Sequence, residues 1–486
     1  TMTTSSLSAL RSFLEGERHY RRGAFAEAVQ EYERAVDADP TFAIALIRLS
    51  EAYGWLESVN SERMTEVGDL AMAQMERLSP RYQFMMESWN ALNHGDPSGV
   101  DVLLQAVQKY PDDPEAWFLL AETYIHLEDA TYSDSDAIVD ALDRAVALDP
   151  DFAPYYIHVI EEAVIRGELD RAQEMLARYE ELTGPSRSLA HVEFAIPIYF
   201  GAEEEARAAA TRLREENPQV APFVDGTFAT KLDQMDRNPL LYPALEAATG
   251  GSRDRFGVWM ATSYGALTQA NRHLDSLSLS GVDVGIQLGH ANELWGVVPE
   301  NALAESFHPD TCEDPAFSTT CYIFMGTAFA REGMWDPHRT VISRIQDRME
   351  TLRTEDPESD VSVLESTLQL LNGYANLHRG NIRAARSSLM ELRTRGGALG
   401  GRARLALGEL EAGQGRVEQA IRHYRSSQRG YQRPRAVLEL ARLSEAAGRP
   451  AEARSYWERF LVITRSGDQD LPQLVEAREA LARLSQ

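Results

Sequence analysis

Residues 156–218 read YIHVI EEAVIRGELD RAQEMLARYE ELTGPSRSLA HVEFAIPIYF GAEEEARAAA TRLREENP, and one pattern runs through them twice. Gly167 and Gly201 are 34 residues apart, and so are Ala172 and Ala206. Such a fixed period is the sign of one supersecondary unit copied in tandem.

Each copy is predicted to be a helical hairpin. Ala172 and Ala206 are small residues where two helices must approach closely. Gly167 and Gly201 are expected to end first helices, because glycine adopts the left-handed conformation at little cost. Three residues mark the borders of the copies at the same 34-residue interval: Pro150, Gly184 and Pro218. Proline at such a border ends the second helix.

A single hairpin cannot bury its apolar face, so the copies must stack on one another. The sequence therefore predicts an all-α, right-handed superhelical solenoid without a sheet. A solenoid also explains how 486 residues can fold without one large central core.

The best single copy of the pattern lies just before this stretch. Its first helix carries Trp117, Leu120, Ala121 and Tyr124, and its second helix carries Ala145 and ends at Pro150. These residues resemble the tetratricopeptide repeat, and the resemblance covers about residues 5–218 and 319–465. It implies about ten hairpins followed by a C-terminal cap helix.

A narrower resemblance lies in residues 42–53, FAIALIRLSEAY. This phrase is similar to repeat arrays that lie C-terminal to bacterial protein kinase or transcriptional-activator domains. None of the kinase signature sequences is present: there is no Gly-rich nucleotide loop, no His-Arg-Asp loop and no Asp-Phe-Gly.

The regularity of the repeat divides the chain into three segments. Residues 1–218 form an N-terminal array, and residues 319–486 form a C-terminal array with the cap helix. Residues 219–318 are expected to form divergent hairpins with long loops, because prolines and glycines interrupt them often. The aromatic residues of this middle segment would either line a ligand groove or form the cores of diverged hairpins.

Charge is unevenly distributed along the chain. The net charge is −27, yet residues 379–465 hold 18 arginines, 8 glutamates and no aspartate, which gives +10 and leaves −37 for the rest. Either this division is compositional drift, or it marks a basic interface that pairs with acidic surfaces. The candidate interface residues are Arg402, Arg404, Arg422, Arg425, Arg429, Arg433 and Arg435.

Cys312 and Cys321 are the only cysteines. A loop of this length could close into a disulfide without strain, which would favour an extracellular or periplasmic protein. Two buried free thiols are the alternative. Zinc would need two further ligands, and the nearest histidines, His290 and His308, fit no usual zinc spacing.

Other chemistry is sparse in the sequence. Asp134, Asp136 and Asp140 lack the glycine and the terminal glutamate of a calcium loop, so helix capping is the preferred interpretation. The glycines of residues 396–401 are not followed by the Lys-Ser or Lys-Thr of a phosphate-binding loop. We therefore expect no enzyme, no catalytic residue, no metal and no cofactor, and no binding of nucleic acid.

Membrane insertion is not indicated either. The longest uncharged stretch, residues 256–271, is 16 residues long, whereas about 20 are needed to span a bilayer. Residues 1–6 do not resemble a signal peptide.

Two functional classes remain from the sequence. The first is a structural protein that associates with copies of itself, head to tail, into an extracellular filament. Two features suggest self-association: the unequal charge of the two ends, and the lack of a polar helix that would cover the N-terminal hairpin. The alternative is an interaction scaffold or sensor that holds a peptide or protein in its concave groove.

Overall fold

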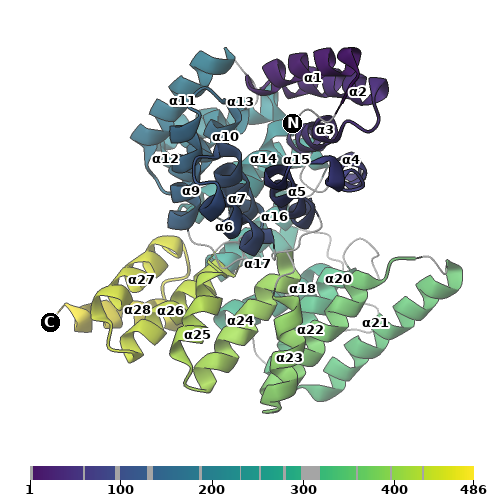
Figure 1. The fold of residues 1–486 in the computed structure, drawn as a ribbon. Helices are drawn as coiled ribbons and strands as arrows, with labels where there is room; N and C mark the ends of the chain where they lie inside the picture. Colours follow the sequence, from purple (N-terminus) through teal and green to yellow (C-terminus); the bar gives the residue numbers. More distant parts are fainter. Residues whose placement is uncertain are drawn as a thin grey trace. The chain divides into compact units, whose positions relative to one another are not determined.

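The computed structural model describes residues 4–57, 61–93, 99–127, 135–184, 189–229, 231–250, 253–276, 281–296, 318–356, 359–393, 397–428 and 432–485. In these ranges all regular structure is helical (Figure 1). The predicted all-α solenoid class is therefore confirmed. The chain forms two compact units, Thr1–Val192 and Glu193–Gln486, and each is considered by itself.

The first unit is a series of antiparallel helix pairs. Each first helix runs into a turn and returns as a second helix, and each pair packs on the next. Its helices are α1 (Leu7–Tyr20), α2 (Phe25–Ala38), α3 (Ala43–Leu56), α4 (Glu62–Met72), η1 (Met75–Arg77), α5 (Pro80–Asn93), α6 (Gly99–Lys109), α7 (Pro114–His126), α9 (Ser135–Leu148), α10 (Pro154–Ile165) and α11 (Leu169–Thr183).

The second unit starts with an irregular part and continues with regular pairs. The boundary with the first unit lies inside α12 (Ala190–Phe200), and α13 (Glu203–Glu216) follows. The irregular part contains η2 (Pro218–Val220), α14 (Ala221–Val224), η3 (Asp225–Ala229), η4 (Met235–Leu240) and α15 (Tyr242–Thr249). The later helices are α16 (Arg253–Ser263), α17 (Leu267–Ser276), α18 (Gly281–Trp295), α20 (Ser318–Arg331), α21 (Trp335–Glu355), α22 (Ser362–His378), α23 (Ile382–Leu392), α24 (Gly397–Gly413), α25 (Val417–Arg425), α26 (Arg433–Ala446), α27 (Pro450–Ile463) and α28 (Pro472–Leu484).

None of the helices in the described ranges is both long enough and apolar enough to cross a lipid bilayer.

A close contact between the two helices of a hairpin sets the geometry of the stack. A large side chain of the second helix lies directly against a glycine of the first helix, 16 residues earlier in the chain. Three hairpins share this contact: Gly16 with Tyr32, Gly373 with Leu389, and Gly408 with Tyr424. A Cβ on Gly16 would lie 2.5 Å from the Tyr32 ring, and one on Gly408 would lie 2.6 Å from the Tyr424 ring. The small residue therefore creates the space that the large one fills.

The repeat-defining residues occupy the positions that the pattern predicts. The small and apolar ones are completely or almost completely buried: Leu120, Ala121, Ala145, Ala172 and Ala206. Trp117 and Tyr124 are partly exposed, and the Trp117 indole donates to the Pro111 carbonyl at 2.9 Å. Pro150 and Pro218 each follow the end of a second helix, α9 and α13.

The two glycines of the quoted stretch behave differently. Gly167 has a φ of +73°, so it ends α10 in the left-handed conformation, as predicted. Gly201 directly follows α12 and so ends a first helix as predicted, but its φ is not positive, and the left-handed conformation is wrong for it. A Cβ on Gly201 would lie 2.5 Å from the Pro197 carbonyl oxygen, so glycine is needed there for space.

The first unit closes on itself through the turn after α1. Arg21 donates two hydrogen bonds to the Asp149 carboxylate, both at 2.8 Å, and its carbonyl accepts from the Ala153 amide at 3.0 Å. The Tyr20 and Phe152 rings lie 5.7 Å apart. The first hairpin is therefore fixed to the connection between α9 and α10, more than 120 residues later.

The second unit closes in the same manner. The Asp468 amide donates to the Gly265 carbonyl at 2.9 Å, and its carboxylate accepts from the Thr268 amide at 2.9 Å. On α28, the Gln473 side chain donates to the Trp295 carbonyl at 2.6 Å. The C-terminal helix thus covers the last hairpin and also joins it to α16, α17 and α18.

Most of the described aromatic side chains of residues 219–318 lie in the core. Phe228, Tyr242, Tyr264 and Trp295 are 0–2% exposed, whereas Phe223 is exposed. Of the two interpretations of these residues, the core of diverged hairpins holds for the four buried ones. Residues 297–317 lie outside the described ranges. The three-segment division by repeat regularity differs from the two compact units and stays a prediction.

Cys321 is a buried residue of α20, packed in an apolar cluster with Phe324 and Met325. It is not a free thiol. Cys312 lies outside the described residues, so the pairing of the two cysteines stays a prediction.

We expect Gly408→Ala to destabilise the second unit by about 1–3 kcal/mol, because its Cβ would press on the buried Tyr424 ring. Urea unfolding followed by circular dichroism measures the effect. Gly413→Ala is the matched control on the same helix. Nothing lies within 4 Å of its Cβ, so it should be neutral or stabilise by up to about 1 kcal/mol. Equal stability of the two variants would contradict the role of the close contact.

For the cysteines, we expect thiol titration of the denatured, non-reduced chain to find no free thiol, and two after reduction. A Cys312→Ser variant should release one titratable thiol at Cys321. Two free thiols in the unreduced wild-type chain would refute the disulfide.

Candidate functional site

The inner surface of the first unit, where the first helices of several hairpins meet, is filled by its own side chains. Trp55 of α3 stacks on His158 of α10 at 5.3 Å, and Phe118 of α7 lies 4.7 Å from Tyr155 of α10, measured between ring centroids. The cavity that remains between these helices has a volume of about 40 Å³. This volume has room for a few water molecules and none for a peptide.

A buried arginine organises one half of this inner surface. Arg48 is 7% exposed. It donates to Glu17 at 3.1 Å, to Glu51 at 2.7 Å and to Glu115. Arg81 approaches Glu115 from the other side at 2.9 Å. Three carboxylates thus surround one guanidinium, and a buried charge of this kind is tolerated only because it is paired and hydrogen-bonded.

The crowding of negative charge separates the pKa values of these carboxyl groups. Burial raises the pKa of Glu51 to about 7, against the attraction of Arg48 and with the help of Glu115. For Glu115, burial acts in the same upward direction, but attraction to Arg48 and Arg81 outweighs it and the pKa falls. Glu51 is therefore the group of this cluster that takes up a proton near neutral pH.

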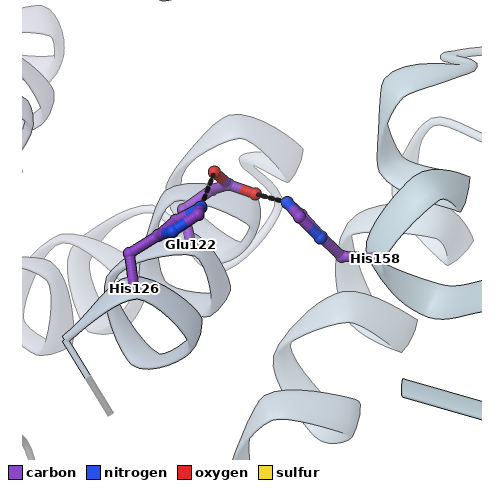
Figure 2. Close-up of side chains that lie close together, drawn as sticks. All are labelled: Glu122, His126 and His158. Carbon is purple, nitrogen blue, oxygen red and sulfur yellow. Dashed lines mark ion pairs between the residues drawn. The ribbon is translucent and has the colours of Figure 1, made fainter. Parts of the chain in front are cut away.

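The other half of the inner surface holds an alternating row of histidine and glutamate side chains. Glu122 lies between His126, at 3.5 Å, and His158, at 2.9 Å (Figure 2). His158 donates through Nδ1 to Glu161 at 2.6 Å, and the other oxygen of Glu161 accepts from His191 at 2.6 Å. Glu122 and His126 are on α7, His158 and Glu161 on α10, and His191 on α12. The row therefore joins three successive hairpins.

The charges of this row reinforce one another. Burial alone would raise the pKa of Glu122, but attraction to His158 and hydrogen bonding from His126 lower it to about 2. The pKa of Glu161 is lowered for the same reason, against the effect of burial. Burial disfavours the charged form of His158, yet the two carboxylates together raise its pKa well above the usual value.

The sequence interpretation did not include this row, although one signal for it exists. Glu122 and His126 are four residues apart on a helix, so they share one face. His158 follows His126 by 32 residues, close to the repeat period of 34. Polar residues spaced by about one repeat lie on the same side of neighbouring hairpins, and this spacing could have identified the row.

The predicted basic interface is not an exposed surface at three of its seven positions. Arg402, Arg404 and Arg433 are only 1% exposed, and for these residues the prediction is wrong. Arg402 pairs with Glu293 at 2.7 Å, and Arg404 donates to the Arg393 carbonyl at 2.7 Å. Each of these buried guanidinium groups has an acceptor in the same unit, which for Arg433 is the Asp233 carboxylate.

The remaining candidates are mostly paired at the surface of the second unit. Arg425 pairs with Glu452 at 2.8 Å, and Arg435 pairs with Glu439 at 2.9 Å. Arg422 is exposed, and Arg429 lies outside the described residues.

Much of the positive charge of residues 379–465 is neutralised within its own unit. Arg433 pairs with Asp233, Arg459 approaches the same carboxylate at 3.4 Å, and Arg465 binds Asp236. The uneven distribution of charge along the sequence therefore reflects ion pairs between distant parts of one unit. Such pairing is an alternative to ion pairs between copies of the chain.

The other sites considered in the sequence analysis have the following positions in the structure. Residues 397–401 lie within α24, so they do not form a phosphate-binding loop. Asp136 pairs with Arg166 at 2.7 Å, and Asp134 is outside the described residues. His290 is buried beside Ser263 at 3.0 Å, and His308 is outside the described residues.

We expect Glu51 to make the first unit less stable as the pH rises from 5 to 8. Its pKa of about 7 in the folded state lies above the ordinary value of 4.5 for a glutamate, so the folded state binds the proton more tightly and loses that advantage as the proton leaves. The loss is on the order of 1–3 kcal/mol. Glu51→Gln should remove it, which urea unfolding at pH 5 and pH 8 would measure.

The matched control for this experiment is Glu27→Gln, an exposed carboxyl group in the first turn of α2. It should keep the wild-type difference between the two pH values. A Glu51→Gln variant with the wild-type difference would show that Glu51 does not take up the proton.

Comparison with known proteins agrees with the repeat pattern. Residues 86–151 and 370–434 match the family model described as the tetratricopeptide repeat. Among curated proteins no sequence matches.

Three of the similar solved structures have low sequence identity to this chain. Yeast Tom70 is 14% identical, with 98% of this chain and 96% of that chain covered and a TM-score of 0.30. Cut9–Hcn1, a hetero-tetramer of APC/C, is 13% identical, with coverage of 99% and 90% and a TM-score of 0.29. MamA from Desulfovibrio magneticus RS-1 is 20% identical, with coverage of 37% and 97% and a TM-score of 0.22.

The family match covers the hairpin of α7 and α9, where Trp117, Leu120, Ala121 and Tyr124 carry the pattern, and a second region around α22 to α25. Tetratricopeptide repeats are thus present in both units, at residues 86–151 and 370–434.

Proposed function

We propose that this chain is a non-catalytic protein-interaction scaffold that associates with copies of itself, end to end. The observation that carries the proposal is the outer face of α1. Leu7 and Leu14 lie seven residues apart on one face of this helix and are 82% and 51% exposed. Large apolar side chains with such exposure favour coverage by another protein surface.

The contrast with the next first helix supports this interpretation. In α3, Ile44, Leu46, Ile47 and Leu49 are all buried, because neighbouring hairpins cover that helix on both sides. The face of α1 that carries Leu7 and Leu14 is of the same kind as the faces that stack inside the unit. A second hairpin stack is therefore a suitable partner for it.

The filled inner surface also argues against a groove that binds a peptide. In the first unit, aromatic rings and the Arg48 cluster occupy the place where a peptide would lie. In the second unit, Arg402, Glu293 and Tyr374 are buried together at the inner helices. Partners would consequently bind at ends and outer faces of the hairpins.

A second copy is the partner that we favour. Repeat stacks have ends of complementary type, because the last hairpin exposes the surface on which a further hairpin would pack. Val462 of α27 and Val475 of α28 are 43% and 40% exposed at the C-terminal end. A contact between unlike ends is heterologous, and it propagates into a filament when its rotation does not close.

Two related proposals accompany this one. An extracellular or periplasmic location follows if Cys312 and Cys321 form the predicted disulfide, since such bonds persist in oxidising compartments. The alternative function is a scaffold or sensor portion of a kinase-like bacterial protein, in which a different protein covers α1. Neither requires catalysis by this chain.

We expect the purified chain to increase in mass with concentration in light scattering at low salt, and to form fibres in electron microscopy. The double variant Leu7→Glu/Leu14→Glu should stay monomeric, because two buried charges at the contact would each cost several kcal/mol. Its folding can be checked by circular dichroism.

The matched control is Leu70→Glu/Leu104→Glu. These leucines are also exposed, at 55% and 38%, but lie on second helices, α4 and α6. This variant should assemble like the wild type. A wild-type chain that stays monomeric under all these conditions would remove self-association and leave a scaffold for other proteins.

A further inference from the structure

Side-chain oxygen and nitrogen atoms of Glu122, His126 and His158 lie close together between α7 and α10. One nitrogen of each histidine and one carboxylate oxygen all lie within 4.8 Å of one another (Figure 2). Glu122 and His158 are buried, whereas His126 is at the edge, with 30% of its side chain exposed. The cluster therefore has a dry interior and one side that solvent can reach.

Two of these atoms are buried against each other. Oε1 of Glu122 and Nε2 of His158 form an ion pair at 2.9 Å, and neither has a hydrogen bond to any other group. Both atoms therefore have room in their coordination for a cation, which would be held between a carboxylate oxygen and an imidazole nitrogen.

The far side of His158 is arranged as a metal ligand requires. Its Nδ1 donates to Oε2 of Glu161 at 2.6 Å. That hydrogen bond fixes the ring and leaves Nε2 directed at Glu122. Histidines that bind metals almost always donate their other ring N–H to a carboxylate, a carbonyl or water. Glu161 is in turn held by His191 at 2.6 Å.

The types of ligand select the class of metal. Two imidazoles and one carboxylate suit zinc and its transition-metal neighbours, and they do not suit magnesium or calcium, which prefer oxygen ligands. Three protein ligands leave a fourth tetrahedral position, which solvent could fill on the exposed side of His126.

We propose that Glu122, His126 and His158 bind one divalent transition-metal ion, most suitably Zn²⁺, with Glu161 as the positioning residue for His158. The ion would link α7 to α10 and so connect two successive hairpins of the first unit. This inference goes beyond the proposed scaffold function and does not depend on self-association.

The alternative for the same residues is a metal-free ion pair. A protonated His158 would lie between the carboxylates of Glu122 and Glu161 and be attracted by both. The two states differ in their dependence on His126. Metal binding requires His126 as a third ligand, whereas the ion pair between His158 and two glutamates does not.

The experiment uses the full chain, stripped with a chelator and then titrated with Zn²⁺ in competition with a chromophoric chelator. Co²⁺ serves as a second probe, because its visible absorption reports tetrahedral nitrogen and oxygen ligands. We expect one equivalent to bind and the melting temperature to rise with the concentration of Zn²⁺.

Variants test which residues bind the metal ion. His126→Ala removes a ligand at the surface, so it should fold normally and lower Zn²⁺ affinity at least about tenfold. Glu161→Gln should lower it by about 10-fold to 100-fold, as second-layer partners typically do, and should change the Co²⁺ spectrum. The matched control is His19→Ala, a histidine of α1 in the same unit and outside the cluster; it should bind like the wild type.

Three results would overturn the proposal. They are the absence of a stoichiometric Zn²⁺ equivalent in the wild-type chain, equal affinity of the His126→Ala and wild-type chains, and loss of binding in His19→Ala instead of His126→Ala. Because His126→Ala leaves the buried residues unchanged, failure to fold would not explain these results.

Discussion

The contact of a glycine or alanine on a first helix with a large side chain on the second is the constraint on which the structure depends. At Gly408, for example, the Tyr424 ring lies so close that no side chain larger than hydrogen fits. This contact fixes the distance between the two helices of a hairpin, and hence the width of each step in the stack. Because every hairpin packs on the next with similar faces, the width of one step influences the curvature of the whole unit.

The curvature of each unit then brings together residues that are not separated by one repeat period in the sequence. In the first unit it places Arg21 on Asp149, and in the second it places Thr268 on Asp468. In both cases an aspartate between two hairpins caps or pairs with groups from an earlier hairpin. These closures explain why the inner surfaces are filled, because closing a stack of only a few hairpins leaves little space in its middle.

The sequence was sufficient to predict the helices and their pairing into hairpins. It was insufficient to predict the contacts between distant hairpins that close each unit. A 34-residue period identifies which residues face the partner helix, and Ala172 and Ala206, predicted where two helices approach closely, are buried. The period does not give the curvature, which depends on small rotations between hairpins. The inward orientation of Arg402 and Arg433 follows from their partners Glu293 and Asp233, which lie more than 100 residues earlier in the chain. No local pattern indicates such a pairing.

The same reasoning applies to the candidate site. Glu122 and His126 can be recognised as neighbours on one helix, but their relation to His158 requires two hairpins to be stacked correctly. Buried charge in the first unit is concentrated on the first helices of the hairpins, in the Arg48 cluster and the His–Glu row. Both groups join different hairpins, and each is stable only when all its members are in place. Polar groups of this kind oppose sliding of one hairpin against another, since a shifted hairpin would leave a buried charge without its partner. The inner surface therefore holds the shape of the unit.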